Sequence, residues 1–494
     1  MQGINEGLIV AACLFLSACT ANTPYRTQFL KNEPCHMPAG TTSTAECEHH
    51  SWQRVGNAYD VLFVEFDDMG LLHPRGGQNV GEAWDQIENT MQTLITMSQQ
   101  GGISLVVYVH GWKHNARADD ENVQQFHNML QNTSLVEQIA QPDVRRRVVG
   151  IYVGWRGLSA TVEPLKEATF WTRKSAALHV AQGSARHFLA RLRAFQRTQN
   201  CQANPDLCKP MADQTARESL KLQKDALRAK VRMVIIGHSF GGLIVFNAIS
   251  EYLIESLTEE GQGSTEGSHG AAAPHRFGDM VILLNPAFEA TRYTPLQRVA
   301  ARRTYDHYQA PILVLITSTA DSATRVFFKL GRKLNSVFER EASEEESLAN
   351  VNTPGHVEQY ITHELTRSPE PQAVSAPCRA WVEPKTAEDM RFNLQLEGEA
   401  AQAFFAAQGT PNDGTQITLN KGWVRTFCGQ TTLKHVTRPA STDSPYQQNH
   451  PNSPIWNVRT DHTIIASHSD INGPLLINFI RQLYHDSATF PARE

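Results

Sequence analysis

The sequence lacks several features that would assign it to common classes of protein. Acidic and basic residues nearly balance, with 45 Lys and Arg against 50 Asp and Glu, so there is no positive excess to bind nucleic acid or an anionic membrane surface. No internal repeat is present. The cysteines show no pair of C-x-x-C motifs. These absences exclude a repeat architecture and a four-cysteine zinc site, and they give no support to nucleic-acid binding.

The N-terminal segment is apolar but short. Residues 1–18 contain an apolar run of 11 residues, which is too short to cross a bilayer of about 30 Å and is typical of a signal peptide, although Met1–Gly7 carries no Lys or Arg. The run ends in Leu-Ser-Ala-Cys at Cys19, which resembles the lipobox of bacterial lipoproteins. The resemblance implies a lipidated Cys19 and a protein anchored in the bacterial cell envelope. Thr20 at the next position implies the outer membrane, with the protein facing the periplasm.

Six cysteines follow Cys19. An even number of cysteines in an exported chain suggests disulfide bonds. Six cysteines allow about 15 pairings, and proximity in the sequence favours three pairs: Cys35–Cys47, Cys201–Cys208 and Cys378–Cys428.

From about residue 56, short apolar runs alternate with longer stretches of helical spacing. The predicted strands are Val61–Phe66, Ile103–Val109, Val148–Val153, Val231–Ile236, Met280–Leu284, Ile312–Ile316 and Trp456–Ile465. Residues 185–195 and 476–483 carry apolar side chains at the spacing of amphipathic helices. Nearly continuous apolar strands alternating with helices predict an α/β fold, with a mostly parallel sheet covered by helices on both faces.

The remaining segments interrupt this alternation. Residues 19–55 are polar and are predicted to be a tether before a single folded domain at 56–494. Residues 368–453 lose the alternation and are rich in Pro, which predicts an insertion before the last strand. The Gly- and Ser-rich Thr258–Pro274 and the acidic Glu339–Ser347 are predicted to be solvated surface.

The most specific motif is Gly237-His-Ser239-Phe-Gly241, which follows an apolar strand and precedes an apolar helix. Glycines two residues on either side of Ser239 allow a sharp turn that lifts the serine hydroxyl clear of the sheet. The N-terminus of the following helix then lies close to any negative charge that develops at the serine. The alternative is a glycine-rich turn with an ordinary serine, but the strand before it and the helix after it favour a nucleophile.

A second motif, Tyr108-Val-His110-Gly-Trp112-Lys-His-Asn-Ala116, ends another strand. Together with the motif at Ser239 and with Asp and His residues late in the chain, it is similar to the α/β-hydrolase superfamily, and to a poorly characterised bacterial group within it. The similarity covers about residues 56–366 and 454–487. It implies the α/β-hydrolase fold and a Ser-His-acid mechanism. It also implies an oxyanion hole formed by the backbone amides of Trp112 and Phe240.

His110 and His114 have the H-x-x-x-H spacing of a helical zinc site. They lie at a strand end, and no Glu follows the first histidine. We therefore expect neither a metal nor an organic cofactor.

The order of the family, Ser then acid then His, guides the choice of the other two residues. Asp321 follows the strand Ile312–Ile316 closely and is the predicted acid, with Glu289 as the alternative. His468 lies in the loop before the last helix and is the predicted base. His462 is a close alternative, and His356 and His363 are weaker ones.

The resemblance therefore implies a membrane-anchored serine hydrolase that acts on carboxylic esters through Ser239, His468 and Asp321. The alternatives are an acyltransferase of the cell envelope and a binding protein that keeps the fold but has lost catalysis. The expected partners are an ester substrate of unspecified size and, through the lipid anchor, a membrane, but not nucleic acid.

Overall fold

The seven apolar runs of the sequence become neighbouring strands of one sheet. The chain was analysed as a computed structural model, which describes residues 20–28, 33–73, 85–140, 146–160, 169–205, 229–259, 276–302, 305, 310–329, 332, 340–369, 424–427, 430–438 and 452–489. The seven strands are β3 (Tyr59–Phe66), β4 (Gly102–Val109), β5 (Arg146–Trp155), β6 (Val231–His238), β7 (Met280–Leu284), β8 (Leu313–Ser318) and β12 (Ile455–Thr460). They run parallel in the order β3-β5-β4-β6-β7-β8-β12, which confirms the α/β class and the mostly parallel sheet.

Shorter strands extend the sheet at both edges to twelve strands in the described part of the chain. They are β1 (Cys35–Met37), β2 (Trp52–Val55), β9 (His363–Arg367), β10 (Val424–Phe427) and β11 (Thr431–His435). β2 is antiparallel to β3, and β10 and β11 form an antiparallel pair beyond β9. The sheet is therefore mixed at its edges and parallel in its centre.

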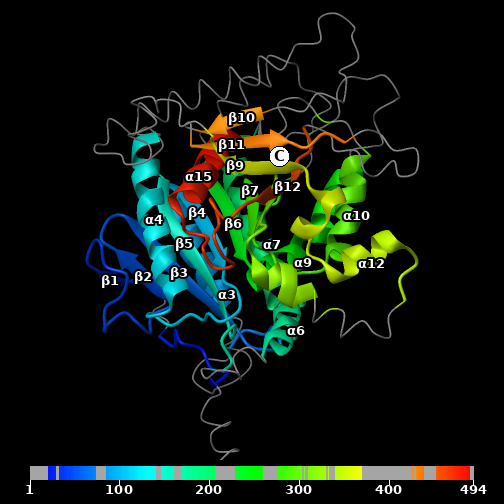
Figure 1. The fold of residues 1–494 in the computed structure, drawn as a ribbon. Helices are drawn as coiled ribbons and strands as arrows, with labels where there is room; N and C mark the ends of the chain where they lie inside the picture. The colour runs from blue at the N-terminus through cyan, green and yellow to red at the C-terminus, as the bar shows by residue number, and fades with distance from the viewer. Residues whose placement is uncertain are drawn as a thin grey trace, which may run out of the picture.

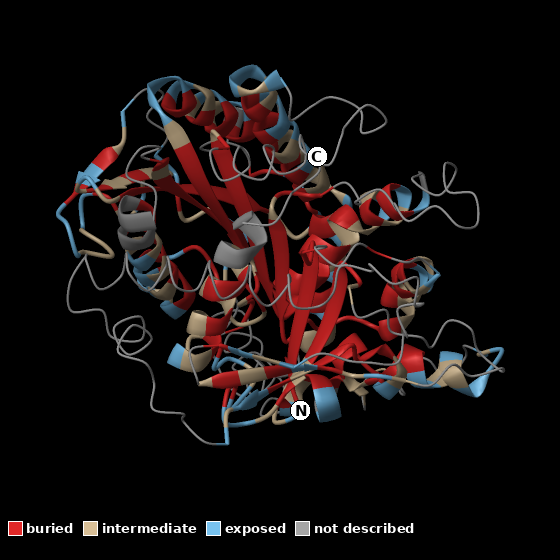
Figure 2. Cartoon of the chain, turned by 90° about the horizontal axis from the view of Figure 1, so that it is seen from above, coloured by how far each residue is buried: buried red, intermediate tan, exposed pale blue. Residues whose placement is uncertain are grey.

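Helices cover both faces of the sheet (Figure 1). One face packs against α3 (Asp85–Gln100), α6 (Phe170–Gln182), α7 (Ser184–Ala203), α9 (Phe240–Glu259) and α10 (Ala290–Ala301), and the other against α4 (Glu121–Ala140) and α15 (Pro474–Thr489). Side chains alternate along each strand, so that Val107 and Ile235 face the first group and Val106 and Ile236 the second. The strands of the sheet are buried between the two layers, and exposed residues lie on the outer sides of the helices (Figure 2).

Helix α9 is unusually apolar. By length and composition, Phe240–Thr258 is the one helix in the described residues that could cross a membrane. It contacts β4 and β6 and the helices α6, α7 and α10, and most of its residues are buried. Burial in the core accounts for its composition.

The structure corrects the prediction that residues 19–55 form a tether. In the described part of this segment, β1 and β2 join the sheet, and Arg26 is 1% exposed. The backbone N–H of Arg26 donates to Glu65 Oε1 at 2.7 Å. Isolated apolar residues of this segment, such as Met37 and Val55, are buried. Because the segment is polar overall, its composition did not indicate that it packs against the domain.

One predicted disulfide is confirmed. Cys35 and Cys47 are bonded, with their Cα atoms 5.6 Å apart. Cys201 is disulfide-bonded, but its predicted partner Cys208 lies outside the described residues. The predicted Cys378–Cys428 pair also lies outside them.

The predicted insertions are described only in part. β10 and β11 belong to the segment 368–453 and lie at the edge of the sheet, whereas most of that segment, and most of Thr258–Pro274, is outside the described residues. The acidic run after Glu339 begins a helix, α12 (Glu344–Val351). Ser343 caps this helix by accepting a hydrogen bond from the Glu346 N–H at 3.1 Å, and the acidic side chains lie on its first turn.

Candidate active site

The central strands end together at one edge of the sheet. The register pairs Val109 of β4 with Gly237 of β6, and Ser318 of β8 with Thr460 of β12. The loops that leave these strand ends therefore meet above the sheet, where ligands generally bind in open α/β sheets. The predicted triad residues Ser239, Asp321 and His468 and the predicted oxyanion residue Trp112 follow these strand ends, and Gly237, Phe240 and Gly241 lie at the end of β6 and the start of α9.

The turn after β6 holds Ser239 in a strained conformation. Ser239 has a φ of 55°, in the left-handed region that a residue with a side chain rarely adopts. Gly241 is required for close packing, because a Cβ there would lie 1.9 Å from the carbonyl oxygen of Val109. A Cβ on Gly237 would lie 2.8 Å from the Gly241 oxygen. The glycines thus let the turn and the start of α9 pack against the end of β4.

The three predicted side chains form a continuous chain of hydrogen bonds. Ser239 Oγ lies 2.7 Å from His468 Nε2, and His468 Nδ1 lies 2.8 Å from Asp321 Oδ2. The ionised carboxylate can only accept, so the proton of the neutral imidazole is assigned to Nδ1, which leaves Nε2 to accept from the serine hydroxyl. This arrangement prepares Ser239 for deprotonation by His468.

Asp321 is held in its ionised form by its neighbours. Burial alone would raise the pKa of its carboxyl, but the charge and hydrogen bond of His468 and two hydrogen bonds from Thr324 lower that pKa below its ordinary value. Thr324 Oγ1 donates to Oδ2 at 2.5 Å, and the Thr324 N–H donates to Oδ1 at 3.1 Å. The carboxylate therefore has a fixed orientation toward His468.

Side chains at the ends of β6, β7 and β8 hold the loop that carries His468 by hydrogen bonds. The His468 carbonyl oxygen accepts hydrogen bonds from Asn285 Nδ2 and from His238 Nε2, each at 3.0 Å. Burial lowers the pKa of His238 to about 3, so its ring stays neutral and the proton is assigned to Nε2. Ser318 Oγ holds the same loop by donating to the Ile465 carbonyl at 2.7 Å.

The turn after β4 approaches the serine closely. A Cβ on Gly111 would lie 2.7 Å from the Ser239 Cβ. The Lys113 N–H is used in a hydrogen bond to the Gly157 carbonyl at 3.1 Å. In the described part of the chain, the N–H groups of Trp112 and Phe240 donate to no carbonyl of a turn or loop. Trp112 follows Gly111 and Phe240 follows Ser239 in the chain, so both amides are available close to this serine.

His110 has a structural role in this turn. Its Nε2 accepts from the Trp155 N–H at 3.1 Å, and its Nδ1 donates to the Gly111 carbonyl at 2.9 Å. Burial lowers the pKa of His110 to about 4, so the ring is neutral. His114 Nδ1 pairs with Asp120 at 3.1 Å. Among the described residues, no group of three His, Cys, Asp or Glu could hold a metal ion.

Aromatic rings pack next to Trp112 and Phe240. The Phe170 ring lies 4.9 Å from that of Phe240 and 5.1 Å from that of Trp112. Trp112 Nε1 donates to Thr169 Oγ1 at 3.2 Å, which fixes the indole. Trp112, Phe170 and Trp171 are only partly buried. They present an apolar surface beside Phe240, the residue that follows Ser239.

Glu289, the alternative acid, belongs to a different cluster. It pairs with Lys174, with Arg292 at 3.0 Å and with Arg332 at 3.5 Å. Burial alone would raise the pKa of Glu289, but Lys174 and Arg292 lower it to about 2. Its carboxylate is occupied by cations rather than by a histidine, so Asp321 is the acid that reaches His468.

The alternative histidines do not contact Ser239. His462 was predicted to lie within the last strand, but β12 ends at Thr460 and the His462 side chain is exposed in the turn that follows. His363 is buried in β9. His356 Nε2 lies 3.0 Å from Thr324 Oγ1 and so reaches Asp321 only through that hydroxyl.

Asn285, His238 and Thr324 belong to this site but were not predicted from the sequence. Asn285 directly follows the buried strand β7 and has a φ of 42°. A polar residue at such a position was the one sequence signal that could have identified it. His238 lies inside the motif around Ser239, and Thr324 follows Asp321 by three residues, at the spacing of a local side-chain cap.

Comparisons of this chain with protein-family models, with curated proteins and with solved structures find no match.

Proposed function

We propose that this protein is a serine hydrolase with an α/β-hydrolase fold, and that Ser239, His468 and Asp321 are its catalytic triad. The observation that carries the proposal is the hydrogen-bonded chain from Ser239 Oγ through His468 to Asp321, at 2.7 and 2.8 Å. The strained φ of Ser239 supports it, because backbone strain of this kind is typical of functional sites. The complete hydrogen-bonded triad is evidence against the alternative of a binding protein that keeps the fold but has lost catalysis.

In the proposed reaction, Ser239 Oγ attacks the acyl carbonyl carbon while His468 Nε2 accepts the hydroxyl proton. The carbonyl oxygen becomes an oxyanion and accepts hydrogen bonds from the amides of Trp112 and Phe240. Collapse of this intermediate expels the alcohol, which takes the proton from His468. Water, activated by the same histidine, then releases the acid from the acyl-enzyme. None of these steps requires a metal or an organic cofactor.

Carboxylic esters are the leading substrate class. The aromatic surface formed by Trp112, Phe170 and Trp171 favours substrates with an apolar group next to the reacting carbonyl. Transfer of the acyl group to an alcohol other than water is the alternative, and both reactions share the same acyl-enzyme.

The ester assignment is tested with a panel of p-nitrophenyl esters from acetate to decanoate. We expect the purified protein to hydrolyse members of the panel and Ser239→Ala to lose this activity, because the variant lacks the attacking oxygen. Circular dichroism of Ser239→Ala checks that the fold is kept. Ester turnover that persists in the folded Ser239→Ala variant would exclude this serine as the nucleophile.

We also propose that a lipid on Cys19 anchors the protein with its active site close to the membrane. The residue after Cys19 is fixed to the body of the enzyme: the Thr20 N–H donates to the Ser159 carbonyl at 3.0 Å, and Thr20 Oγ1 donates to the Leu158 carbonyl at 2.6 Å. The Leu158 N–H in turn donates to the His114 carbonyl, in the turn that carries Trp112. An anchor at this point favours ester substrates in or near the same membrane.

Replacement of Cys19 by serine tests the anchor. Cys19→Ser should move the protein from the membrane fraction to a soluble or unprocessed form, because the lipid is attached through the thiol. Cell fractionation with an antibody against the protein measures the distribution, and Cys201→Ser is a control that leaves the lipidation site intact. An unchanged membrane fraction for Cys19→Ser would contradict lipid anchoring at this residue.

A further inference from the structure

Two large apolar side chains are exposed on the turn that follows β3. Met69 is 62% exposed and Leu71 is 57% exposed, the two highest values among the large apolar residues in the described part of the chain. A single exposed apolar residue is common on protein surfaces and needs no explanation. Here the two most exposed ones lie two positions apart on one turn, so they form a joint apolar surface.

The backbone of this turn, residues 67–71, is held rigidly. The Asp67 N–H donates to the Leu71 carbonyl at 2.8 Å, and Asp67 Oδ1 accepts from the N–H groups of Met69 and Leu71, each at 2.9 Å. Gly70, between the two exposed residues, has a φ of 79°, and a Cβ there would lie 2.1 Å from the His179 carbonyl oxygen of α6. The turn therefore packs on α6 through Gly70, while its two apolar side chains stay exposed.

The turn is joined to the residue that follows the proposed lipid anchor. Thr20 directly follows Cys19 in the chain. Arg156 Nη1 donates to the Thr20 carbonyl at 2.8 Å, and Arg156 Nε donates to Asp68 Oδ1 at 3.3 Å. Asp68 directly precedes Met69. One arginine side chain therefore connects the point where the anchor meets the enzyme to the exposed turn.

The charges around the turn balance. Asp67 and Asp68 carry two negative charges, and Arg156 and Arg173 carry two positive ones. Both arginines pair with Asp68, Arg173 at 2.6 Å. Neither attraction nor repulsion by charged lipid headgroups is therefore expected here, and the apolar side chains determine what this surface contacts.

The turn leaves the same edge of the sheet as the catalytic serine. β3 and β6 run parallel in the order β3-β5-β4-β6, and the register pairs Phe66 with Trp155 and Val109 with Gly237. Three strand spacings separate β3 from β6, which is about 14 Å. A surface that contacts this turn would therefore lie at the edge of the sheet that carries Ser239.

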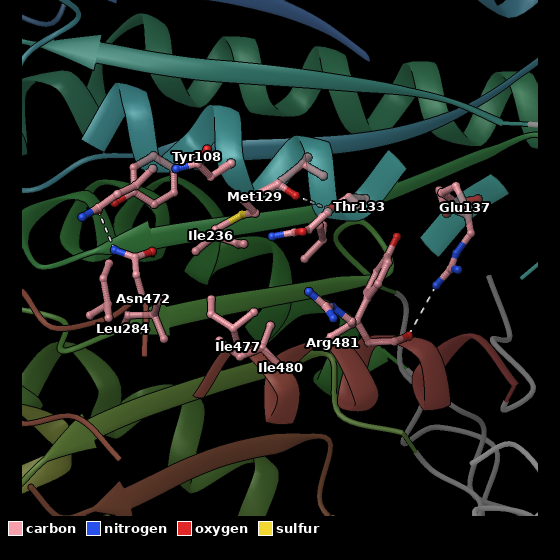
Figure 3. Close-up of a pocket in the computed structure, with 18 of the residues that line it drawn as sticks. Tyr108, Met129, Thr133, Glu137, Ile236, Leu284, Asn472, Ile477, Ile480 and Arg481 are labelled. Carbon is pink, nitrogen blue, oxygen red and sulfur yellow. Dashed lines mark hydrogen bonds between the residues drawn. The ribbon is translucent and has the colours of Figure 1, made fainter. Parts of the chain in front are cut away.

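Another apolar region lies elsewhere in the fold. A cavity of about 290 Å³ between α4 and α15 is lined by Met129, Ile477 and Ile480, among others (Figure 3). Neither Met69 nor Leu71 lines it, and its two helices cover the face of the sheet opposite to α6. The apolar surface that is connected to the proposed anchor is the one on the turn.

We propose that Met69 and Leu71 insert into the surface of the phospholipid bilayer that holds the anchor. This inference rests on the proposed lipid anchor at Cys19. An anchor alone keeps the protein at the membrane but leaves it free to rotate, whereas a second contact beside it restricts the orientation. Burial of both side chains among the lipids is favourable. The contact turns the edge of the sheet that carries the triad toward the membrane, where an ester in the bilayer can reach it.

A fluorescent label on the turn tests this inference. The lipidated protein carrying Met69→Cys is isolated from membranes, labelled at the new cysteine with nitrobenzoxadiazole and reconstituted into phosphatidylcholine vesicles. We expect a blue-shifted emission, and quenching by a doxyl-labelled lipid about threefold stronger than for the control label, since an inserted side chain lies about 5 to 10 Å deep. Leu71→Cys should behave in the same way. Val424→Cys is the matched control, because Val424 is also apolar and 56% exposed but lies on β10, at the other edge of the sheet.

Flotation of the vesicles separates this inference from the proposed anchor. Protein that does not float with the vesicles would overturn the anchor and, with it, the insertion of the turn. Protein that floats, but whose labels at Met69 and Leu71 are quenched by aqueous iodide as strongly as the label at Val424, would overturn the insertion and leave the anchor in place. Protection from iodide without quenching by the doxyl-labelled lipid would indicate contact with a second copy of the chain and would also overturn it.

Discussion

Replacement of His468 by alanine is expected to lower kcat for ester hydrolysis by about three to six orders of magnitude, as removal of a triad member does in known serine hydrolases. The variant keeps Ser239 but loses the imidazole whose Nε2 lies 2.7 Å from Ser239 Oγ and accepts its proton in the proposed reaction. Asp321 keeps its two hydrogen bonds from Thr324, so the loss of stability should be moderate, about 1 to 3 kcal/mol. Steady-state kinetics on a p-nitrophenyl ester and thermal unfolding measure the two effects.

His462→Ala is the matched control for this experiment. His462 is only six residues earlier in the chain, but its side chain is exposed in the turn after β12. Its removal should change neither kcat nor stability appreciably, with a stability change within about 0.5 kcal/mol. The sequence pattern alone favoured a buried position in the last strand and hence a loss of stability, and the observed end of β12 reverses that expectation. Comparable losses of activity in both variants would remove the distinction between the two histidines.

Moderate acid is expected to unfold the protein well before its carboxylates are protonated. Five buried histidines have pKa values lowered by burial: those of His110 and His356 to about 4, those of His127 and His238 to about 3, and that of His363 well below its ordinary value. Above the unfolded pKa of about 6.5, neither the folded nor the unfolded chain binds these protons, and stability is complete. Below it, only the unfolded chain binds them, so the free energy of unfolding falls by about 1.4 kcal/mol per histidine and pH unit.

This loss continues down to about pH 4 for His110 and His356, and down to about pH 3 for His127 and His238. Over about two pH units it becomes comparable to the whole stability of a typical domain, about 5 to 15 kcal/mol. Urea unfolding between pH 7 and 4.5, followed by circular dichroism, measures the slope. His127→Gln should reduce the slope by about one proton, whereas the exposed His462→Gln should not change it. A constant free energy of unfolding across this range would contradict the neutral burial of these rings.

The central strands and the triad could be predicted from the sequence because each has a strong local signal. Strands buried on both faces require uninterrupted apolar runs, and the turn at Ser239 requires glycines at two fixed positions. Asp321 and His468 follow predicted strands in the order of the superfamily, and their positions just beyond β8 and β12 bring them to the same edge of the sheet. Because β6, β7, β8 and β12 are neighbours in the sheet, residues that are far apart in the sequence lie together at this site.

The strands at the edges of the sheet have no comparable signal in the sequence. β1 and β2 have only three and four residues, and their pairing depends on neighbours that are distant in the sequence. The same holds for the partners that position the triad: the bond from Asn285 to the His468 carbonyl spans 183 residues, and the bond from His238 to the same oxygen spans 230. Polar contacts of this kind follow from the fold and have no periodicity that a sequence reading can detect.

Activation of Ser239 as a nucleophile can be measured with a fluorophosphonate probe. The purified, folded protein is treated with the probe, and the adduct is mapped by mass spectrometry of its peptides. We expect one adduct, on Ser239, that is absent from Ser239→Ala and forms far more slowly in His468→Ala. A folded protein that is not labelled, or an adduct that persists in Ser239→Ala, would contradict it.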